Sequence, residues 1–414
     1  PGLYTTSQEN RPRPLSGSSF TSPLVPADRN LTEKEAVSQS FAHVSILGAG
    51  PAGLYAAILL RKGFPNASVV VYERNPRRAT FGFGVVFSDR ALDFMQSDVP
   101  ELLDLIRPDM QQWSDMQLSL PTRDVTLDGV GFSAVGRMQL LSRLEQYAVS
   151  LGVKIKYESE ISDIGELRTD LIIGADGIQS LVRDSDIETF QPALSYFNNH
   201  FAWFGVALPF ETLTQTFIET NLGPMNAHHY RYSASMSTFI VECEPRTWKA
   251  YGFESMDEQQ SADTCAALFA NTLKNTPLIT NHSHWRRFPR LWCKRWVSGN
   301  RVLLGDAAHS AHFSIGSGTR LAMEDAIALV RAIGEEKDLP SGLAAYERNR
   351  QPIAEKITNA ANRSAEWYDA FAEKMKMPPL DFAKDYLMRS GRIDLPQLRK
   401  MAPQFMAEYD QSAE

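Results

Sequence analysis

The chain has 414 residues, of which 43% are hydrophobic and 22% charged, and its formal net charge is −7. This length and composition predict a globular protein with a large core, in more than one domain. The acidic balance argues against a general nucleic-acid or anionic-membrane surface, and no apolar run approaches the roughly 18 residues of a membrane helix. Cys243, Cys265 and Cys293 lie far apart without metal-ligand spacing, so we expect a reduced, cytoplasmic protein.

The N-terminal segment, residues 1–40, is rich in Ser, Pro, Thr and Asn and has only isolated apolar residues. It predicts an extended or disordered extension. The first strong pattern follows: an apolar strand at 43–47, a glycine-rich turn, a helix at 51–62, and a β-branched strand at 68–72 that ends at Glu73. This order is typical of the βαβ unit of a dinucleotide-binding fold.

The rest of the chain changes character twice. A short buried strand at 170–174 continues the α/β pattern. From 190 to 296, aromatic and β-branched residues alternate with polar ones, which predicts an antiparallel sheet that forms one wall of a pocket. A buried strand at 301–304 and a helix at about 318–335 then return to the α/β pattern. The chain after residue 340 is predicted to be helical, with interruptions at Pro378-Pro379 and at Gly391.

The turn after the first strand contains Gly48-x-Gly50-x-x-Gly53. Its glycines permit a tight turn and let the backbone approach a pyrophosphate at the N-terminus of the following helix. Glu73 is placed to accept hydrogen bonds from the diol of a ribose. A glycine string alone is a weak signal, but the complete order of strand, helix, strand and acid predicts a dinucleotide site. An acid here favours FAD or NAD over NADP, although the neighbouring Arg74 leaves that preference open.

Two further strings favour a flavin as the ligand. Gly305-Asp306 follows a buried strand, where an aspartate can bind the hydroxyl groups of a ribityl chain. Gly316-Ser317-Gly318 begins the next helix, whose N–H groups and dipole suit the flavin edge that becomes negative on reduction. A third string, Gly174-Ala175-Asp176-Gly177, predicts by itself either a capped surface turn or a part of the same site.

Together these strings resemble the single-component FAD-dependent aromatic hydroxylases, the p-hydroxybenzoate hydroxylase-like group. Within it the chain is most similar to the salicylyl-CoA 5-hydroxylase and anthraniloyl-CoA monooxygenase family, over roughly residues 42–400. The similarity rests on Phe81-Gly-Phe-Gly-Val-Val-Phe-Ser-Asp89, on residues 305–326, and on Phe239-Ile-Val-Glu242. The tryptophan hydroxylase of violacein synthesis is similar around residues 312–316.

The resemblance implies an α/β fold with a Rossmann-like FAD-binding domain, an antiparallel-sheet substrate domain and a helical C-terminal region. The expected bounds are 41–189 with 297–340 for the FAD-binding domain, 190–296 for the substrate domain and 341–414 for the helical region. The resemblance also implies an oxidoreductase that uses NADPH or NADH and O2 to hydroxylate an activated aromatic ring through a flavin C4a-hydroperoxide. Its substrate would be of the hydroxy- or aminobenzoyl type, as a free acid or a CoA thioester.

The resemblance also implies a role for each matched residue. Gly48, Gly50, Gly53 and Glu73 would hold the ADP half of FAD, with Arg74 beside them; Arg137 would contact the phosphate or ribityl region; Asp176 belongs to a motif associated with FAD and NAD(P)H use; Gly305 and Asp306 would hold the ribityl chain, and Gly316, Ser317 and Gly318 the flavin edge.

One departure from the group's pattern concerns the rim between flavin and substrate. Where the wider group carries Pro-Pro, this chain has His312-Phe313. A catalytic His312 would bind or deprotonate a phenol or aniline, because the histidine pKa lies near working pH; otherwise it only shapes the loop. His228 and Tyr230 on the predicted sheet, together with Phe313, are candidate substrate contacts. We expect no metal site, because no Cys/His cluster is visible in the sequence.

Some alternatives stay open at the level of the sequence. The segment 285–296 holds five cations, which suit the phosphates of a CoA thioester or of NADPH but equally form a solvated face. The other activities considered are hydroxylation of a natural-product or tryptophan-derived intermediate, FAD-dependent oxidation or dehydrogenation without oxygen insertion, and flavin binding without catalysis.

Overall fold

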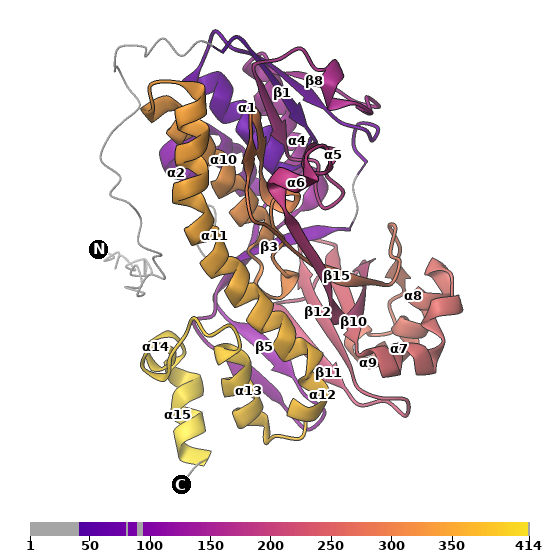
Figure 1. Ribbon diagram of the computed structural model, residues 1–414. Helices are drawn as coiled ribbons and strands as arrows, with labels where there is room; N and C mark the ends of the chain where they lie inside the picture. Colours follow the sequence, from indigo (N-terminus) through magenta and orange to yellow (C-terminus); the bar gives the residue numbers. More distant parts are fainter. Residues whose placement is uncertain (1–40, 80–81, 89–93, 413–414) are drawn as a thin grey trace, which may run out of the picture.

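The computed structural model describes residues 41–79, 82–88 and 94–412. The expected N-terminal extension, Phe81 and Asp89 lie outside these residues. The described part of the chain forms a six-stranded, an eight-stranded and a three-stranded sheet. Figure 1 shows the six-stranded sheet in the upper half of the molecule and the eight-stranded sheet in the lower half, with the long helix α11 (Leu339–Asp369) running beside both.

The six-stranded sheet contains the predicted βαβ unit. β1 pairs in parallel with β2 and with β9, and β17 is parallel to β9. Helices α1, α4 and α10 pack against one another and share one hydrophobic core with this sheet, which explains why its inner strands are continuously apolar. In sheet order, the strands are β16 (Val297–Ser298), β17 (Arg301–Leu303), β9 (Leu171–Gly174), β1 (His43–Leu47), β2 (Ser68–Tyr72) and β8 (Lys154–Lys156). The helices are α1 (Pro51–Gly63), α4 (Arg137–Ser150) and α10 (Gly318–Glu335).

The eight-stranded sheet contains the predicted antiparallel strands but draws on more of the chain than the sequence indicated. Two strands from before residue 190 join it, because β5 pairs in parallel with β11. Its central strands β10, β13, β12 and β11 are antiparallel neighbours. The strands are β14 (Leu278–Ile279), β10 (Pro192–Val206), β13 (Ser237–Cys243), β12 (Met225–Arg231), β11 (Leu213–Ile218), β5 (Met116–Ser119), β6 (Asp124–Leu127), and β15 (Arg286–Cys293) beside β10.

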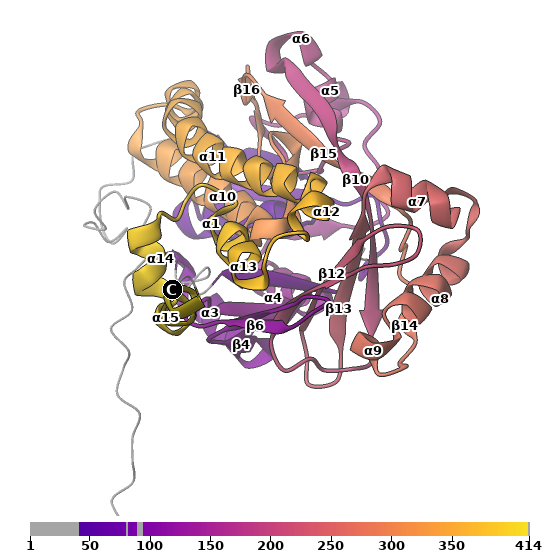
Figure 2. The ribbon, with the colours of Figure 1, turned by 90° about the horizontal axis from the view of Figure 1, so that it is seen from below.

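The two faces of this sheet have different coverings. On one face, side chains such as Phe204, Phe239 and Val241 form a core with Cys265 and Phe269 from the outer helices. Figure 2 shows these helices on one side of β10, β12 and β13, and α11 to α13 on the other. The first face is therefore covered by a hydrophobic core, and the second face is turned toward the rest of the molecule. The outer helices are α7 (Pro245–Tyr251), α8 (Glu258–Leu268) and α9 (Ala270–Leu273).

A small third sheet connects the two large ones, and the C-terminal region is helical, as predicted. α13 begins at Pro379 and the chain turns again at Gly391, so the two expected interruptions are confirmed. Among the described helices, none combines the length and the apolar character that crossing a membrane requires. The remaining elements are β3 (Gly84–Ser88), β7 (Phe132–Gly136), β4 (Gln111–Trp113), α2 (Phe94–Asp98), α3 (Pro100–Ile106), α5 (Leu181–Asp184), α6 (Ile187–Phe190), α12 (Phe371–Lys374), α13 (Pro379–Met388), α14 (Leu395–Met401) and α15 (Pro403–Ser412).

Candidate functional site

Three of the four glycine-containing strings lie side by side because they follow three neighbouring parallel strands. β1, β9 and β17 are adjacent in the sheet, and each string begins at the carboxyl end of its strand. A Cβ on Gly48 would lie 2.3 Å from the carbonyl oxygen of Ala175, and a Cβ on Gly305 would lie 3.7 Å from Cβ of Ala52. The carboxyl ends of parallel strands are where open α/β sheets bind their ligands. The structure thus assembles one site from segments about 250 residues apart.

The turn after β1 is too crowded for side chains except on one side. Gly48 has φ +98, and a Cβ on Gly53 would lie 2.0 Å from the carbonyl oxygen of Gly48. A Cβ on Gly50, by contrast, would meet no atom within 4 Å. Gly50 is the N-cap of α1, so the open side of the turn coincides with the positive end of that helix. A pyrophosphate group fits this position.

Glu73 ends β2 and closes the turn. Its Oε2 accepts the N–H of Ala49 at 2.9 Å, and its Oε1 accepts the N–H and the Nδ2 of Asn75. A carboxylate has about four acceptor positions, so capacity remains for a ribose hydroxyl. Arg74 beside it is exposed.

Arg137 and Asp306 lie close enough for the charge of Arg137 to act on the carboxyl group of Asp306. The Nε of Arg137 is buried and has no hydrogen-bond partner among the described residues. The Asp306 side chain is exposed, yet its pKa is raised because protein surrounds it on its other sides, and the positive fields of His309 and Arg137 oppose that rise. An unpaired guanidinium and an open carboxylate in one recess match the phosphate and the hydroxyl groups of a flavin cofactor.

Two more buried polar atoms near these strings lack partners in the described part of the chain. They are Oδ1 of Asp176 and Oγ of Ser317. The other carboxylate oxygen of Asp176 accepts the N–H of Leu181 at 2.7 Å, and burial raises the pKa of Asp176. Ser317 directly precedes α10, with Gly316 in the left-handed region at φ +61 and Gly318 as the first helical residue. Buried polar atoms are normally hydrogen-bonded, so these orphans fit a site completed by a polar cofactor.

A buried ion network holds the Gly305-Asp306 loop from behind. Asp325 on α10 accepts the N–H of Gly305 at 2.9 Å, and its carboxylate is paired with His309 at 2.8 Å and with Arg350 at 2.7 Å. The pKa of Asp325 is lowered because the fields and hydrogen bonds of these two partners outweigh its burial. His309 therefore contributes to the architecture of the loop.

His312 and Phe313 lie on the rim that the sequence analysis singled out. Phe313 is half-buried, and its ring centroid lies 4.2 Å from that of His312, 4.9 Å from that of Phe201 and 5.2 Å from that of His228. The rim thus packs directly on β10 and β12 of the eight-stranded sheet. His312 is 3% exposed, and burial lowers its pKa to about 4. The expectation of a pKa near working pH was wrong, because the exposed value of a histidine does not hold in this buried place.

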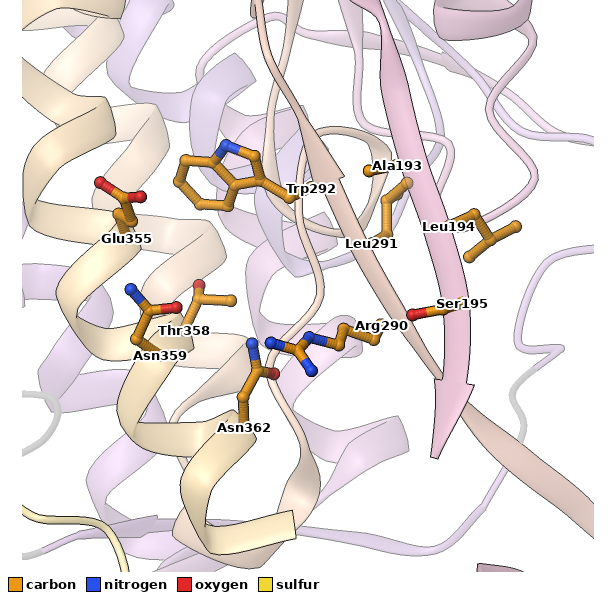
Figure 3. Close-up of a pocket in the computed structure, with 10 residues that line it drawn as sticks. All are labelled: Ala193, Leu194, Ser195, Arg290, Leu291, Trp292, Glu355, Thr358, Asn359 and Asn362. Atoms are coloured by element: carbon orange, nitrogen blue, oxygen red, sulfur yellow. The ribbon is translucent and has the colours of Figure 1, made fainter. Parts of the chain in front are cut away.

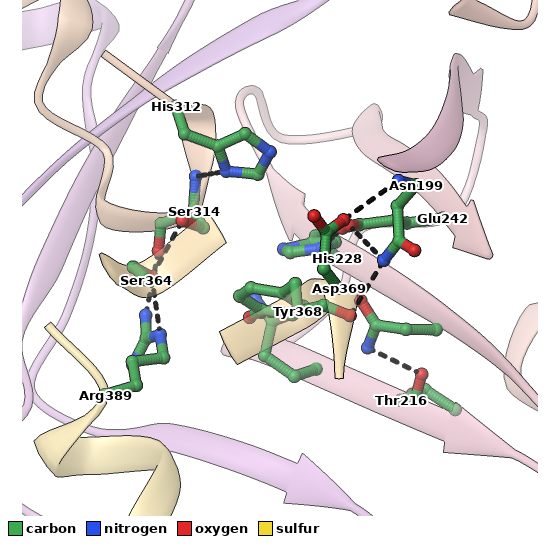
Figure 4. A network of polar contacts seen from close by, with 12 residues as sticks. Asn199, Thr216, His228, Glu242, His312, Ser314, Ser364, Tyr368, Asp369 and Arg389 are labelled. Carbon is green, nitrogen blue, oxygen red and sulfur yellow. Dashed lines mark hydrogen bonds and ion pairs between the residues drawn. The ribbon is translucent and has the colours of Figure 1, made fainter. Parts of the chain in front are cut away.

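A second polar group, which the sequence analysis did not recognise as one unit, lies under the rim (Figure 4). The Nε2 of His228 is 3.0 Å from Oε2 of Glu242, and Oε1 of Glu242 accepts the Nδ2–H of Asn199 at 2.9 Å. Burial lowers the pKa of His228 to about 3, with help from the field of Arg389, and burial raises the pKa of Glu242. The sequence analysis used Glu242 only as one residue of the family string Phe239–Glu242, and no sequence pattern pointed to Asn199.

Tyr230 has a more structural environment than its place in the sequence suggested. It is 3% exposed, and its hydroxyl donates to the carbonyl oxygen of Gly84 at 3.0 Å. That hydrogen bond ties β12 to β3, which lies within the family string 81–89. Tyr230 remains a candidate substrate contact only through its ring.

The C-terminal helices reach the rim. Arg389, the C-cap of α13, donates to the carbonyl oxygen of Ser314 at 2.8 Å and to Oγ of Ser364 at 3.0 Å (Figure 4). The hydroxyls of Ser314 and Ser364 are 2.8 Å apart. The loop that carries His312 is therefore fastened to α11 and α13.

A cavity of about 280 Å³ lies between α11 and the paired strands β10 and β15 (Figure 3). None of the predicted cofactor or substrate residues lines it. Two of its lining side chains, Thr358 and Asn362, are buried and carry an oxygen without a hydrogen-bond partner among the described residues. The lining residues are Ala193, Leu194, Ser195, Arg290, Leu291, Trp292, Glu355, Thr358, Asn359 and Asn362.

Comparisons with known proteins agree with this site. Residues 144–361 match the FAD binding domain family, and residues 46–82 match the NAD(P)-binding Rossmann-like domain family. The chain is 38% identical over 359 residues to salicyloyl-CoA 5-hydroxylase from Streptomyces sp, an alignment that covers 84% of this chain and 69% of the relative. It is 30% identical to 3-hydroxy-4-methyl-anthranilyl-[aryl-carrier protein] 5-monooxygenase from Streptosporangium sibiricum, over 84% of this chain and 95% of that one.

A third relative and a solved structure complete the comparison. Protodeoxyviolaceinate monooxygenase from Chromobacterium violaceum is 31% identical, over 86% of this chain and 96% of the relative. The fold is similar to that of 2-methyl-3-hydroxypyridine-5-carboxylic acid oxygenase, with a TM-score of 0.65 and 19% identity over 88% of this chain and 96% of that chain. The predicted resemblance, fold class and FAD cofactor are confirmed. The chain belongs to the family of FAD-dependent aromatic monooxygenases, enzymes that use FAD together with NAD(P)H.

Proposed function

We propose that this monooxygenase hydroxylates a ring that bears a hydroxyl or amino group beside a carbonyl, with the carbonyl bound as a thioester. The observation that carries the proposal is the rim of His312 and Phe313, which covers the polar pair of His228 and Glu242 between the flavin loop and the substrate sheet. The names of two relatives support it, because salicyloyl and anthranilyl groups carry a hydroxyl or an amino group next to a carbonyl on a carrier.

We propose that the cofactor is held by the residues that the sequence singled out. Gly48, Gly50 and Gly53 would admit the pyrophosphate, and Glu73 with Arg74 would lie at the adenosine ribose. The remaining predicted contacts are Arg137, Asp176, Gly305, Asp306, Gly316, Ser317 and Gly318. Bound FAD supplies the redox chemistry, accepting a hydride from NAD(P)H and activating O2.

The rim residues would exclude water and orient the ring. Phe313 contacts Phe201 and Trp203 from β10, with centroids 4.9 and 6.5 Å away, so an aromatic surface faces the ring to be hydroxylated. Exclusion of water protects a reactive oxygen species from hydrolysis and strengthens the polar contacts in the site. Phe313 would thus act through its position and its apolar surface, and it would take no chemical part in the reaction.

His312 would serve as a hydrogen-bond donor rather than as a base. With a pKa of about 4 it is neutral at physiological pH. Its Nδ1 accepts the N–H of Ser314 at 3.3 Å, which leaves the ring proton on Nε2. A neutral Nε2–H can donate to a carbonyl or phenolate oxygen of the substrate.

His228 and Glu242 would bind the hydroxyl or amino group of the ring. Both shifts favour the uncharged forms, so one proton is held between Nε2 of His228 and Oε2 of Glu242 across 3.0 Å. Asn199 fixes the carboxylate from its other side. A polar pair of this kind would recognise the substituent that activates the ring by hydrogen bonding to it, and a ring without that substituent would lack this contact.

Within the basic segment 285–296, one residue supports a substrate bound as a thioester. Arg290 pairs with Glu366, Arg295 with Glu347, and Arg287 donates to backbone carbonyls. Arg286 differs: its guanidinium lies 5.2 Å from the centroid of the Phe201 ring, and burial together with the field of Arg137 lowers its pKa. We propose that Arg286 receives a phosphate of the carrier or of the nucleotide.

The test is a screen for NAD(P)H oxidation and product mass with salicylate, anthranilate and their CoA thioesters. We expect the thioesters to stimulate NAD(P)H oxidation and to gain one oxygen atom, and Arg286→Ala to raise KM for the thioester more than for the free acid. A variant at a solvent-exposed cation with no predicted role, Lys249→Ala, is the control. Oxidation of either set without gain of an oxygen atom would contradict the proposal, and equal rates for both sets would remove the thioester from it.

A further inference from the structure

A cluster of three metal-ligating side chains lies outside the predicted flavin and substrate residues. Glu258 is the first residue of α8, and His282 and His284 lie in the loop between β14 and β15. Each offers one ligand atom, and these atoms all lie within 4.8 Å of one another. The Nε2 of His284 is 3.0 Å from Oε1 of Glu258. The sequence analysis anticipated no metal site, because the acid and the histidines are separated by more than 20 residues.

Hydrogen bonds of the residue between the two histidines hold the cluster in position. The second carboxylate oxygen of Glu258 accepts the N–H of Ser283, between the two histidines, at 2.8 Å. Ser283 is 1% exposed, and its hydroxyl donates to the carbonyl oxygen of Trp203 at 2.6 Å. His282 has φ +53, a left-handed conformation that is costly for a residue with a side chain and that clusters at ligand sites. The loop is therefore constrained in a shape that brings both imidazoles to the acid.

We propose that Glu258, His282 and His284 bind one Zn²⁺ ion, with water as the fourth ligand. Zn–N and Zn–O bonds of about 2.0–2.2 Å in a tetrahedron require ligand atoms about 3.3 Å apart. The pair of His284 and Glu258 is already near that separation. Both histidines are exposed, so rotation of their side chains closes the remaining gap without moving the core. Two imidazoles and one carboxylate favour Zn²⁺ over Mg²⁺ or Ca²⁺, which prefer oxygen ligands.

The ion would brace one wall of the active site. Asn281 donates from Nδ2 to the carbonyl oxygen of Gly82 at 2.9 Å, and Ser283 binds Trp203. A Cβ on Gly82 would lie 3.3 Å from the Trp203 ring, and that ring is 6.5 Å from the Phe313 ring. An ion that joins the loop to α8 would restrain this wall. Binding of the ion does not depend on the proposed substrate, so each proposal can fail without the other.

The test is titration of the purified FAD-loaded protein, free of any histidine tag, with ZnCl2 in a calorimeter. We expect one site with micromolar or tighter affinity and a rise in melting temperature on addition of Zn²⁺. His284→Ala and Glu258→Gln should each weaken binding by about tenfold or more. The glutamine keeps an oxygen for the Ser283 N–H, so the second variant removes a ligand charge without releasing the loop.

The control is His43→Ala, which removes another exposed histidine outside the cluster and should leave binding unchanged. Cysteine does not compete in the folded protein, because Cys243, Cys265 and Cys293 are all buried. Absence of a one-to-one site in the wild type, or equal affinity in the His284→Ala variant, would overturn the proposal.

Discussion

Asp306 ends the loop after β17 with its carboxylate open to solvent and the Arg137 guanidinium nearby. Arg137 has a buried Nε without a hydrogen-bond partner among the described residues. Arg137 alone has an unfavourable place, because a buried donor without a partner costs about 1–3 kcal/mol. A cofactor that offers both hydroxyl groups and phosphates would satisfy the two together, so we expect FAD affinity to depend strongly on either residue.

Asp306→Ala should leave a folded protein that has lost its bound flavin. The hydroxyl groups of the ribityl chain would lose a charged acceptor, which is worth about 1.5–3 kcal/mol, or roughly 10- to 100-fold in affinity. The ratio of flavin absorbance to protein after gel filtration measures this loss. Asp104→Ala is the matched control, since Asp104 is exposed and, among the described residues, pairs with Arg107 alone. Full retention of flavin in the Asp306 variant would remove Asp306 from the site.

Three buried histidines predict how stability depends on pH. Burial lowers the pKa of His228 and His229 to about 3 and that of His312 to about 4. In the unfolded chain a histidine takes up a proton below pH of about 6.5, whereas in the folded chain these three stay neutral until much lower pH. The unfolded state therefore binds more protons between these values, and folding stability falls as the pH drops below 6.5.

We expect each of these histidines to destabilise the protein by about 2 kcal/mol at pH 5 relative to pH 7. His229 is the best residue for a test, because it pairs with Thr216 at 2.8 Å and is not part of the proposed chemistry. Urea unfolding of wild type and His229→Gln at both pH values measures the difference. The variant should lose about 2 kcal/mol less on acidification; an equal loss in both proteins would contradict the assigned pKa.

At the scale of elements, the glycines of the unit β1–α1–β2 determine how closely the turn and the helix pack. Gly53 belongs to α1 but packs against the backbone of Gly48, and Gly50 lies on the open side of the turn. The same residue type therefore has two functions, one in close packing and one in leaving room for a ligand. Substitution with alanine separates these functions.

Gly50→Ala should fold normally but bind FAD about tenfold more weakly or worse, because the added methyl group would occupy the space that faces a pyrophosphate. Its φ of −74 is allowed for alanine. Gly53→Ala should instead destabilise the apoprotein, since its Cβ would lie 2.0 Å from a backbone oxygen. Denaturant unfolding of the apoproteins and flavin titration check the two effects. Wild-type flavin affinity in the Gly50 variant would show that the pyrophosphate binds elsewhere.

At the scale of the whole molecule, α11 connects parts that the chain order keeps far apart. In the first half of α11, Arg350 is paired with Asp325, which supports the Gly305-Asp306 loop. Near the end of α11, Ser364 lies beside Arg389 and beside the loop that carries His312. The C-terminal helices are therefore part of the support of the active site.

Arg350→Met should destabilise the protein by about 3–5 kcal/mol, because it leaves Asp325 as a buried charge with one fewer partner. The Gly305 loop should loosen as well, so flavin content should fall with stability. Thermal or chemical unfolding measures the first effect and absorbance the second. Arg348→Met on the same helix is the control, since Arg348 is exposed and should change stability by no more than about 0.5 kcal/mol. Similar losses in both variants would show that the effect belongs to the helix and not to the ion pair.

The local features of the site could be predicted from the sequence. The glycine turn and Glu73 directly follow a strand, and the aspartates at 176 and 306 lie within three residues of the end of one. Glycines and acids at these carboxyl ends indicate a ligand site in an open α/β sheet. The order of parallel strands then forces the three strings together. For the same reason the helical C-terminal region and its two interruptions were legible from proline and glycine.

The tertiary structure alone decided what depends on burial and on distant partners. The low pKa of His312 follows from the rings and strands packed around it, and the sequence shows none of them. Glu242 meets His228 because β12 and β13 pair in one register, and Glu258 meets His282 and His284 because a loop returns to α8. The sequence by itself determined the family and predicted the candidate flavin site, because both rest on short-range backbone chemistry. The charge states and the second cluster were decided by folding, because electric fields and desolvation act through space and not along the chain.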